Sequence, residues 1–315
     1  MRDAAAAAFF MSGLTVSGLR YKIYGNAEQE KDRGLYYMGD TLKKCLAAGA
    51  AALAAWALLI RPRTKYSPDL SALAAYDFAN GGLHDFYKGI PKNSLPAVKA
   101  AMDGGYAVKL DVRVSRDGVP VILSDHELYG LCGVDGETED KALAELKKFK
   151  LQETDETVCT LEEMLAEINC RVPVILELMV YRDNYGTLCR RVTDVLEKYD
   201  GVYAVESADY RAVRWFKKYE PDVLRGQILG RASYAGKDLL SALVCFARNM
   251  MFTNILSSPD YISAGYTERK NISLRYCKLL YHVPVVCRDI KTKEQYETAR
   301  SDDEIAVFEN MEPGD

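Results

Sequence analysis

The alternation of two kinds of segment after residue 62 limits the fold of this chain more than any other feature. Runs rich in Val, Ile and Leu predict strands at 107–114, 120–123, 173–178, 202–205, 223–229, 284–287 and 304–308, with further candidates at 76–79 and 261–264. Amphipathic stretches predict helices such as 94–102, 161–168, 185–199, 210–219 and 293–299. This alternation indicates an α/β protein with a parallel sheet and crossover helices.

The number of candidate strands, eight or nine, favours a closed TIM (β/α)8 barrel over an open doubly wound sheet. The sequence has no glycine-rich phosphate loop of the Walker or Rossmann type, which would have supported the open sheet. We therefore expect one barrel over residues 62–315. Its functional groups should lie at the carboxyl ends of the strands.

An uncharged segment, residues 45–60, precedes the predicted barrel. Lys43 and Lys44 lie before it, and Arg61, Arg63 and Lys65 follow. As a helix it reaches roughly 24 Å, short of a hydrocarbon core of roughly 30 Å, and snorkelling basic side chains can cover the difference. We predict a transmembrane anchor over residues 45–61. A buried Ala-rich helix and a cleaved signal peptide are the alternatives.

The remaining composition bears on location and partners. Basic residues flank the anchor on both sides and give a small bias toward a cytoplasmic barrel. Eight scattered cysteines without a C-x-x-C pair suggest reduced thiols. A net charge of −4 without a basic run argues against nucleic acid as a partner. Residues 1–44 form an extension, either partly disordered or with a second hydrophobic segment at 4–19. Its true start, Met1 or Met38, is open.

Five short motifs follow one another in a distinctive order. They are PKNSL at 91–95, KLDV at 109–112, RDGVPVILSD at 116–125, CTLEE at 159–163 and LELM at 176–179. With these motifs the chain, from about residue 76 to 309, resembles the glycerophosphodiester phosphodiesterase family. The resemblance implies a TIM barrel and a role in glycerophospholipid metabolism.

The chemistry implied by the resemblance uses one divalent cation, Ca²⁺ or Mg²⁺, held by three carboxylates. Two histidines act as general acid and base, and an arginine holds the phosphate. The cation neutralises an anionic phosphodiester, and the alkoxide leaving group needs a proton. In this chain Asn80 and Ser124 stand at the two histidine positions and Gly81 at the arginine position. Neither Asn nor Ser performs acid–base chemistry near neutral pH.

The metal positions are altered as well. Lys109 stands where the resemblance implies the first metal carboxylate, and Asp111 and Glu177 remain as the other two ligands. Residues i and i+2 of a strand share a face, so the Lys109 ammonium should lie beside Asp111. Our hypothesis is that Lys109 replaces the metal electrostatically by pairing with Asp111 and Glu177. The alternative is that Lys109 points elsewhere and a weak metal site persists.

Two histidines near these motifs could replace the missing ones. His84 follows Asn80 closely and His126 lies just beyond Ser124, so both should border the barrel mouth. We expect them to be rim residues, with replacement of the acid or the base as the alternative. Lys92 stands in place of a family glutamate, and together with Gly81 and Lys109 it marks the predicted ligand-contact positions.

The sequence thus predicts a membrane-anchored barrel that is catalytically impaired, holds no cofactor and binds an anionic or polyol ligand, such as a glycerophosphodiester or another phosphate-containing small molecule. The alternative is an active metal-dependent phosphodiesterase that releases glycerol 3-phosphate and an alcohol, with one Ca²⁺ or Mg²⁺ as cofactor. A purely structural membrane scaffold is a third possibility.

Overall fold

The computed structural model describes residues 41–64, 68–230 and 239–314, and the chain divides into two units, Met1–Trp56 and Ala57–Asp315. The helix Thr41–Leu59 is long and apolar enough to cross a membrane by length and composition. It starts ahead of the predicted segment 45–61, because Leu42, Lys43 and Lys44 are good helix formers that extend it. The expectations for residues 1–40, including a start at Met38, lie outside the described residues.

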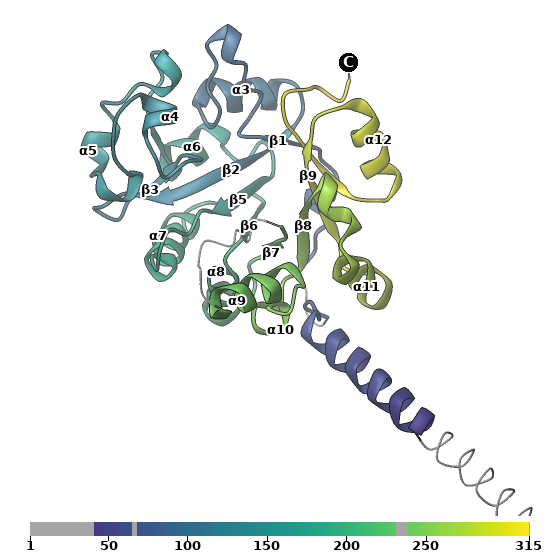
Figure 1. Ribbon diagram of the computed structural model, residues 1–315. Coiled ribbons are helices and arrows are strands. Elements are labelled where there is room, and N and C mark those ends of the chain that lie inside the picture. Colours follow the sequence, from purple (N-terminus) through teal and green to yellow (C-terminus); the bar gives the residue numbers. More distant parts are fainter. Residues whose placement is uncertain (1–40, 65–67, 231–238, 315) are drawn as a thin grey trace, which may run out of the picture. The chain divides into compact units, whose positions relative to one another are not determined.

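Eight parallel strands close into a barrel in the second unit (Figure 1). They are β1 (Phe78–Asn80), β2 (Ala107–Val114), β5 (Val174–Leu178), β6 (Tyr203–Ser207), β7 (Arg225–Ile228), β8 (Tyr261–Gly265), β9 (Val285–Ile290) and β10 (Ile305–Phe308). β1 pairs with both β10 and β2, which closes the ring. The predicted TIM barrel is confirmed.

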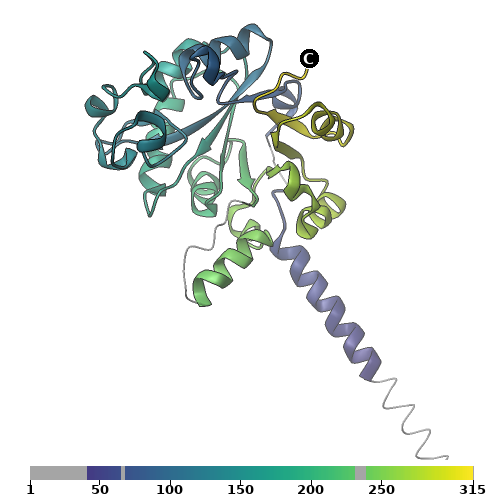
Figure 2. The same ribbon diagram turned by 45° about the horizontal axis from the view of Figure 1, so that its top comes forward.

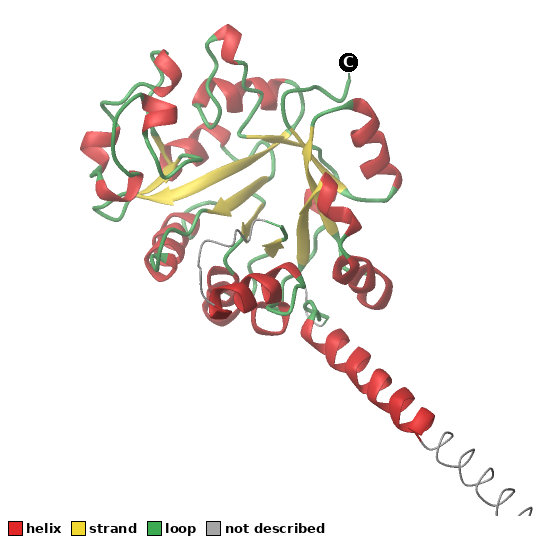
Figure 3. Cartoon of the chain, viewed as in Figure 1, coloured by secondary structure: helices red, strands yellow, loops and turns green. Residues whose placement is uncertain are grey.

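Helices surround this ring of strands (Figure 3). The longer ones are α3 (Leu95–Asp103), α6 (Leu161–Ile168), α7 (Tyr185–Leu196), α8 (Tyr210–Tyr219), α9 (Leu239–Asn249), α11 (Ile272–Tyr281) and α12 (Lys293–Ser301). Short helices are α2 (Ser71–Ala74), α4 (Tyr129–Cys132), α5 (Leu143–Leu146) and α10 (Asn254–Ser257), with 3-10 turns at Phe86–Lys88, Thr138–Asp140, Leu151–Glu153 and Tyr266–Lys270. Side chains start several helices: Thr160, for example, accepts a hydrogen bond from the Glu163 amide while Glu163 accepts one from the Thr160 amide.

The expected strand at 120–123 forms but does not belong to the barrel. It is β3 (Pro120–Ile122), which pairs antiparallel with β2 and then with β4 (Cys159–Thr160). The connection from β2 is a tight turn in which Gly118 has a φ of +81° and the Ser115 amide donates to the Val119 carbonyl. A connection this short cannot make a parallel crossover, so the chain reverses.

The barrel strands are buried on both faces, as parallel strands usually are. Every residue of β2 and β5 is buried, and their outer faces lie under apolar helix faces. Toward the carboxyl ends of the strands the inward-facing side chains become polar. These polar side chains form the candidate site.

Candidate active site

Three carboxylates and one ammonium come together where β2, β5 and β6 approach their carboxyl ends. Asp111 on β2 is in register with Glu177 on β5, and Glu177 is in register with Glu206 on β6. Lys109 precedes Asp111 by two residues, so both side chains project from the same face of β2. The strand register therefore assembles a cluster from residues that lie far apart in the sequence.

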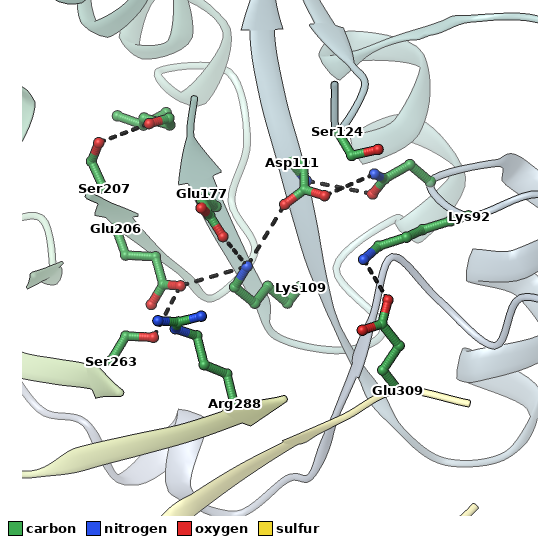
Figure 4. A network of polar contacts seen from close by, with 12 residues as sticks. Lys92, Lys109, Asp111, Ser124, Glu177, Glu206, Ser207, Ser263, Arg288 and Glu309 are labelled. Atoms are coloured by element: carbon green, nitrogen blue, oxygen red, sulfur yellow. Dashed lines mark hydrogen bonds and ion pairs between the residues drawn. The ribbon is translucent and has the colours of Figure 1, made fainter. Parts of the chain in front are cut away.

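The Lys109 ammonium lies in the middle of this cluster (Figure 4). Its Nζ donates a hydrogen bond to Glu177 Oε2, and it lies 3.7 Å from both Asp111 Oδ1 and Glu206 Oε1. Lys109, Glu177 and Glu206 are each only 1% exposed. Glu206 was absent from the predicted site. The sequence did contain a sign that Glu206 belongs to the site. Glu177 and Glu206 are each the fourth residue of their strands, VILEL and YAVES, which follow one another in the barrel.

A second cation and a hydroxyl lie beside Glu206. Arg288 on β9 lies close to Glu206 (Figure 4), and Ser263 Oγ donates to Glu206 Oε1 at 3.2 Å. Burial raises the pKa of the Glu206 carboxyl, and neighbouring Glu177 adds to the rise; together they outweigh the lowering by Lys109, Arg288 and Ser263. The Arg288 guanidinium also pairs with Asp289 at 2.9 Å and with Glu268 at 3.1 Å. Lys109 is therefore the central cation of the three carboxylates, and Glu206 holds a proton more readily than an ordinary glutamate.

The barrel interior next to the cluster is filled by the Tyr261 ring, which is fully buried. A Cβ on Gly226 would lie 2.3 Å from Tyr261 Cε2, so β7 needs a glycine here. Burial and the adjacent Glu206 raise the pKa of the Tyr261 hydroxyl well above its ordinary value. The cluster therefore packs against a neutral side chain.

Two asparagines lie next to the cluster. Asn93, which has a φ of +63°, donates from Nδ2 to Asp111 Oδ2 at 3.1 Å. Asn80 ends β1 in register with Lys109, and among the described residues its buried Oδ1 accepts no hydrogen bond. The position that resembles the first family histidine therefore carries a buried acceptor that receives no hydrogen bond from the described part of the chain.

A second lysine–carboxylate pair lies at the rim of the mouth. Lys92 Nζ is 2.6 Å from Glu309 Oε1, and His84 Nε2 is 3.5 Å from the same oxygen. Burial would raise the pKa of Glu309, but the nearby His84 ring and the hydrogen bond and charge of Lys92 hold it well below its usual range. A cavity of about 590 Å³ opens beside this pair, and its walls include His84, Tyr87 and Glu309.

Lys92 also explains the glycine at the predicted arginine position. Gly81 has a φ of +72°, and a Cβ there would lie 2.3 Å from Lys92 Cγ. The Lys92 side chain thus occupies the space that a side chain at residue 81 would need. The two substitutions are sterically coupled.

The structure places the other predicted residues around the cluster rather than in it. The Ser124 carbonyl accepts hydrogen bonds from Arg113 Nε at 3.2 Å and Nη2 at 3.0 Å. The His126 ring stacks on Tyr181 at 5.0 Å, and its side chain is 41% exposed. Neither His84 nor His126 contacts the Lys109 cluster through an interaction seen among the described residues.

The residues present do not fit the divalent cation that the fold implies. A cation bound by Asp111, Glu177 and Glu206 would have to lie between them, where the Lys109 ammonium now makes its contacts. An ammonium cannot be a metal ligand, and its charge would repel a cation at that distance. We therefore derive no reaction step through a metal.

Sequence comparison identifies the family. A profile of the glycerophosphoryl diester phosphodiesterase family matches residues 82–249, more than half of the chain. The chain belongs to this family. Glycerophosphodiester phosphodiesterase 1 of Rattus norvegicus is 29% identical over 121 residues, which cover 36% of this chain. The match spans 33% of the rat protein, about a third of its length.

Solved structures of glycerophosphodiester phosphodiesterases share the barrel. An Oleispira antarctica phosphodiesterase in complex with the product sn-glycerol-3-phosphate superposes with a TM-score of 0.60 at 22% identity, over 76% of this chain and 94% of that one. A Thermotoga maritima glycerophosphodiester phosphodiesterase gives 0.57 at 18% identity, over 74% and 93%. At these identities the likeness concerns the fold.

Proposed function

We propose that this family member has lost efficient phosphodiester hydrolysis and uses its barrel mouth to bind a small anionic or polyol ligand. The observation that carries the proposal is the Lys109 ammonium among Asp111, Glu177 and Glu206. In this arrangement the carboxylates are neutralised by the protein's own cation. Lewis-acid activation of a phosphodiester would need that place for a metal.

The residues around the Lys109 cluster also support a loss of efficient hydrolysis. Asn80 and Ser124 cannot transfer protons near neutral pH, and a positioned general acid or base contributes roughly 10² to 10⁴ in rate. His84 is engaged with Glu309 at the rim, and His126 is stacked on Tyr181. Loss of even one such group leaves a slow enzyme.

Ligand contacts are best provided by the rim. The Lys109 ammonium is buried and surrounded by carboxylates, whereas Lys92 is 22% exposed and occupies the space of a side chain at residue 81. Lys92 therefore supplies a cation for a phosphate, and the Asn80 amide oxygen accepts a hydrogen bond from a hydroxyl. A polyol phosphate combines both groups, and the Oleispira phosphodiesterase was solved with such a molecule.

The helix Thr41–Leu59 anchors the protein in a membrane in this proposal, with the barrel in the cytoplasm. Its 19 residues reach roughly 28 Å, close to a hydrocarbon core of roughly 30 Å. None of its most apolar window is buried in the protein. Retention in the membrane pellet after alkaline extraction, with an uncleaved N-terminus, is the expected result. A cleaved N-terminus would show a signal peptide instead.

The function is tested by assaying the full-length chain against a panel of glycerophosphodiesters with and without Ca²⁺ or Mg²⁺. We expect no turnover above that of the Asp111→Ala variant. Cation-dependent turnover that Asp111→Ala abolishes would instead show an active phosphodiesterase. Calorimetric titration with sn-glycerol 3-phosphate, glycerol and inorganic phosphate then tests binding, which Lys92→Gln should weaken for the two phosphates but not for glycerol.

A further inference from the structure

We propose that α9, α10 and α11 form a membrane-docking face that rests on an anionic bilayer, in addition to the anchor helix. The docking face is defined by the exposed residues Leu239, Leu243 and Phe246 of α9, Ile255 of α10, and Leu279 and Leu280 of α11. α9, α10 and α11 lie on one side of the barrel in both views (Figures 1 and 2). This inference rests on the membrane anchor proposed above.

The sequence and exposure of α9 do not suit contact with water. Its sequence, LLSALVCFARN, has no charge before Arg248, none of its residues is buried, and Leu239 is 77% exposed. The exposed residues of α9 are all apolar, whereas its polar residues Ser241, Arg248 and Asn249 are half-buried. An exposed apolar patch normally marks contact with a partner or a membrane. At roughly 16 Å, its 11 residues are too short to cross a bilayer. A position in the bilayer surface fits both its length and its composition.

The docking face surrounds the point where the chain leaves the barrel toward the anchor. The Tyr281 hydroxyl of α11 donates to the Ala57 carbonyl at 2.8 Å. The Ile60 carbonyl accepts from Asn254 Nδ2 of α10 at 3.0 Å and from the Cys277 thiol of α11 at 3.5 Å. Residues 57–59 are the last residues of the helix Thr41–Leu59, and Ile60 follows directly. A bilayer that holds this helix therefore meets the barrel beside α10 and α11.

α9 is joined to the same surface. Asn271, which caps the N-terminus of α11, donates from Nδ2 to the Asn249 carbonyl at the end of α9 at 2.9 Å. The rings of Phe246 and Phe252, on the way to α10, pack edge to face at 6.0 Å. These contacts hold the three helices together, so their apolar side chains can reach one surface at the same time.

A basic cavity borders the docking face and gives the expected charge of the membrane. It measures about 770 Å³. Its walls hold four basic residues, Arg269, Lys270, Arg275 and Lys278, together with Leu279 and His282, and its two acidic residues, Asp302 and Glu304, form ion pairs with Arg269 and Lys278. Lys270 and Arg275 are exposed, and neither forms an ion pair within the described ranges. Basic residues near a membrane surface attract acidic lipids by about 1 kcal/mol each. The cavity therefore suits the phosphate of an anionic lipid headgroup next to the apolar contact of Leu279.

The test places fluorescent noncanonical residues in the full-length chain, reconstituted in phosphatidylglycerol liposomes whose acyl chains carry bromine as a quencher. One probe replaces Leu243 of α9 and another replaces Leu279 of α11. A probe in place of Leu53 reports on the anchor helix. A probe in place of Tyr129 of α4, which is 70% exposed, is the matched control.

We expect the probes at Leu53, Leu243 and Leu279 to lose most of their fluorescence and the probe at Tyr129 to keep it. Quenching at Leu53 alone would agree with the anchor but refute the docking face. This result is expected if residues 1–40 or a second copy of the chain, and not the bilayer, covers α9. Absence of quenching at all four positions would refute the anchor as well. Equal quenching at Tyr129 would show unspecific contact and refute the docking face.

A separate experiment tests whether the docking face requires acidic lipid. In phosphatidylglycerol vesicles the double change Lys270→Gln and Arg275→Gln should weaken the docking equilibrium about fivefold per lost charge. The change Lys148→Gln with Arg190→Gln removes two exposed basic residues elsewhere and should have no effect. Equal quenching in phosphatidylcholine vesicles, or no loss in the Lys270→Gln and Arg275→Gln chain, would overturn a role of acidic lipid.

Discussion

Two lysine–carboxylate pairs stand at different depths of the same barrel mouth. The Lys109–Glu177 pair is 1% exposed on both sides and has two more carboxylates around it, whereas the side chains of Lys92 and Glu309 are 22% and 16% exposed. Both lysines stand where the family resemblance implies glutamate. A lysine at a position where the resemblance implies glutamate therefore occurs once in the buried interior and once at the partly exposed rim of the same protein.

The difference shows how burial decides what a charge pair does. In the interior, water cannot solvate a carboxylate that loses its partner, so the Lys109 cluster holds together or costs much free energy. At the rim, where the two side chains are 22% and 16% exposed, water replaces a lost partner in part, so Lys92 can leave Glu309 for a ligand phosphate at a lower cost than Lys109 can leave its cluster. We therefore assign a structural role to the inner pair and a binding role to the outer one.

The largest expected effect is from Lys109→Met, which leaves three buried carboxylates without their central cation. Removing one partner of a buried pair typically costs about 3–5 kcal/mol, and the free energy of unfolding in urea should fall by that amount. Lys92→Met is the matched control at the rim. Similar losses in the two variants would erase the distinction between the pairs.

Lys109→Glu should convert the inner cluster into a cation site. This change places four carboxylates together, so we expect an unstable protein whose melting temperature rises with added Ca²⁺. A ligand at a hundred times its Kd stabilises a protein by about 2.7 kcal/mol. The wild-type chain is the control and should show no rise. A Ca²⁺-dependent rise in the wild type would mean that Lys109 does not exclude the metal.

Lys92→Met should cost about 1–2 kcal/mol, less than Lys109→Met, because the pair is partly hydrated and His84 remains close to Glu309. The same urea titration measures it. A loss above that of Lys109→Met would place the structural pair at the rim instead.

The smallest expected effect is on the stability of the protein at acidic pH. The pKa of Glu309 is lowered in the folded protein, so its contribution to stability is complete above the unfolded value of about 4.3 and is lost as the pH falls below it. Stability of the wild type should therefore drop more steeply than that of Lys92→Met below about pH 4.3. Unfolding midpoints across this range measure the two slopes, and parallel curves would argue against a coupling of Lys92 and Glu309.

The barrel could be predicted from local patterns because strands and helices have short, different periods in the sequence. The strand predicted at 120–123 forms, but the direction of a strand cannot be predicted from an apolar run, and the Gly118 turn makes β3 run antiparallel to β2 outside the barrel. α9 and α11 were missed because their exposed faces are apolar and lack a clear polar side.

The sequence by itself determined the alternating elements and the order of the motifs that resemble the family, since these depend on local residues. Only the tertiary structure decided which charges meet. Glu206 joins Lys109 through strand register, and Glu309 reaches Lys92 across 217 residues because β10 closes the barrel beside β1. Such contacts follow from the register and closure of the sheet, and no short stretch of sequence encodes them.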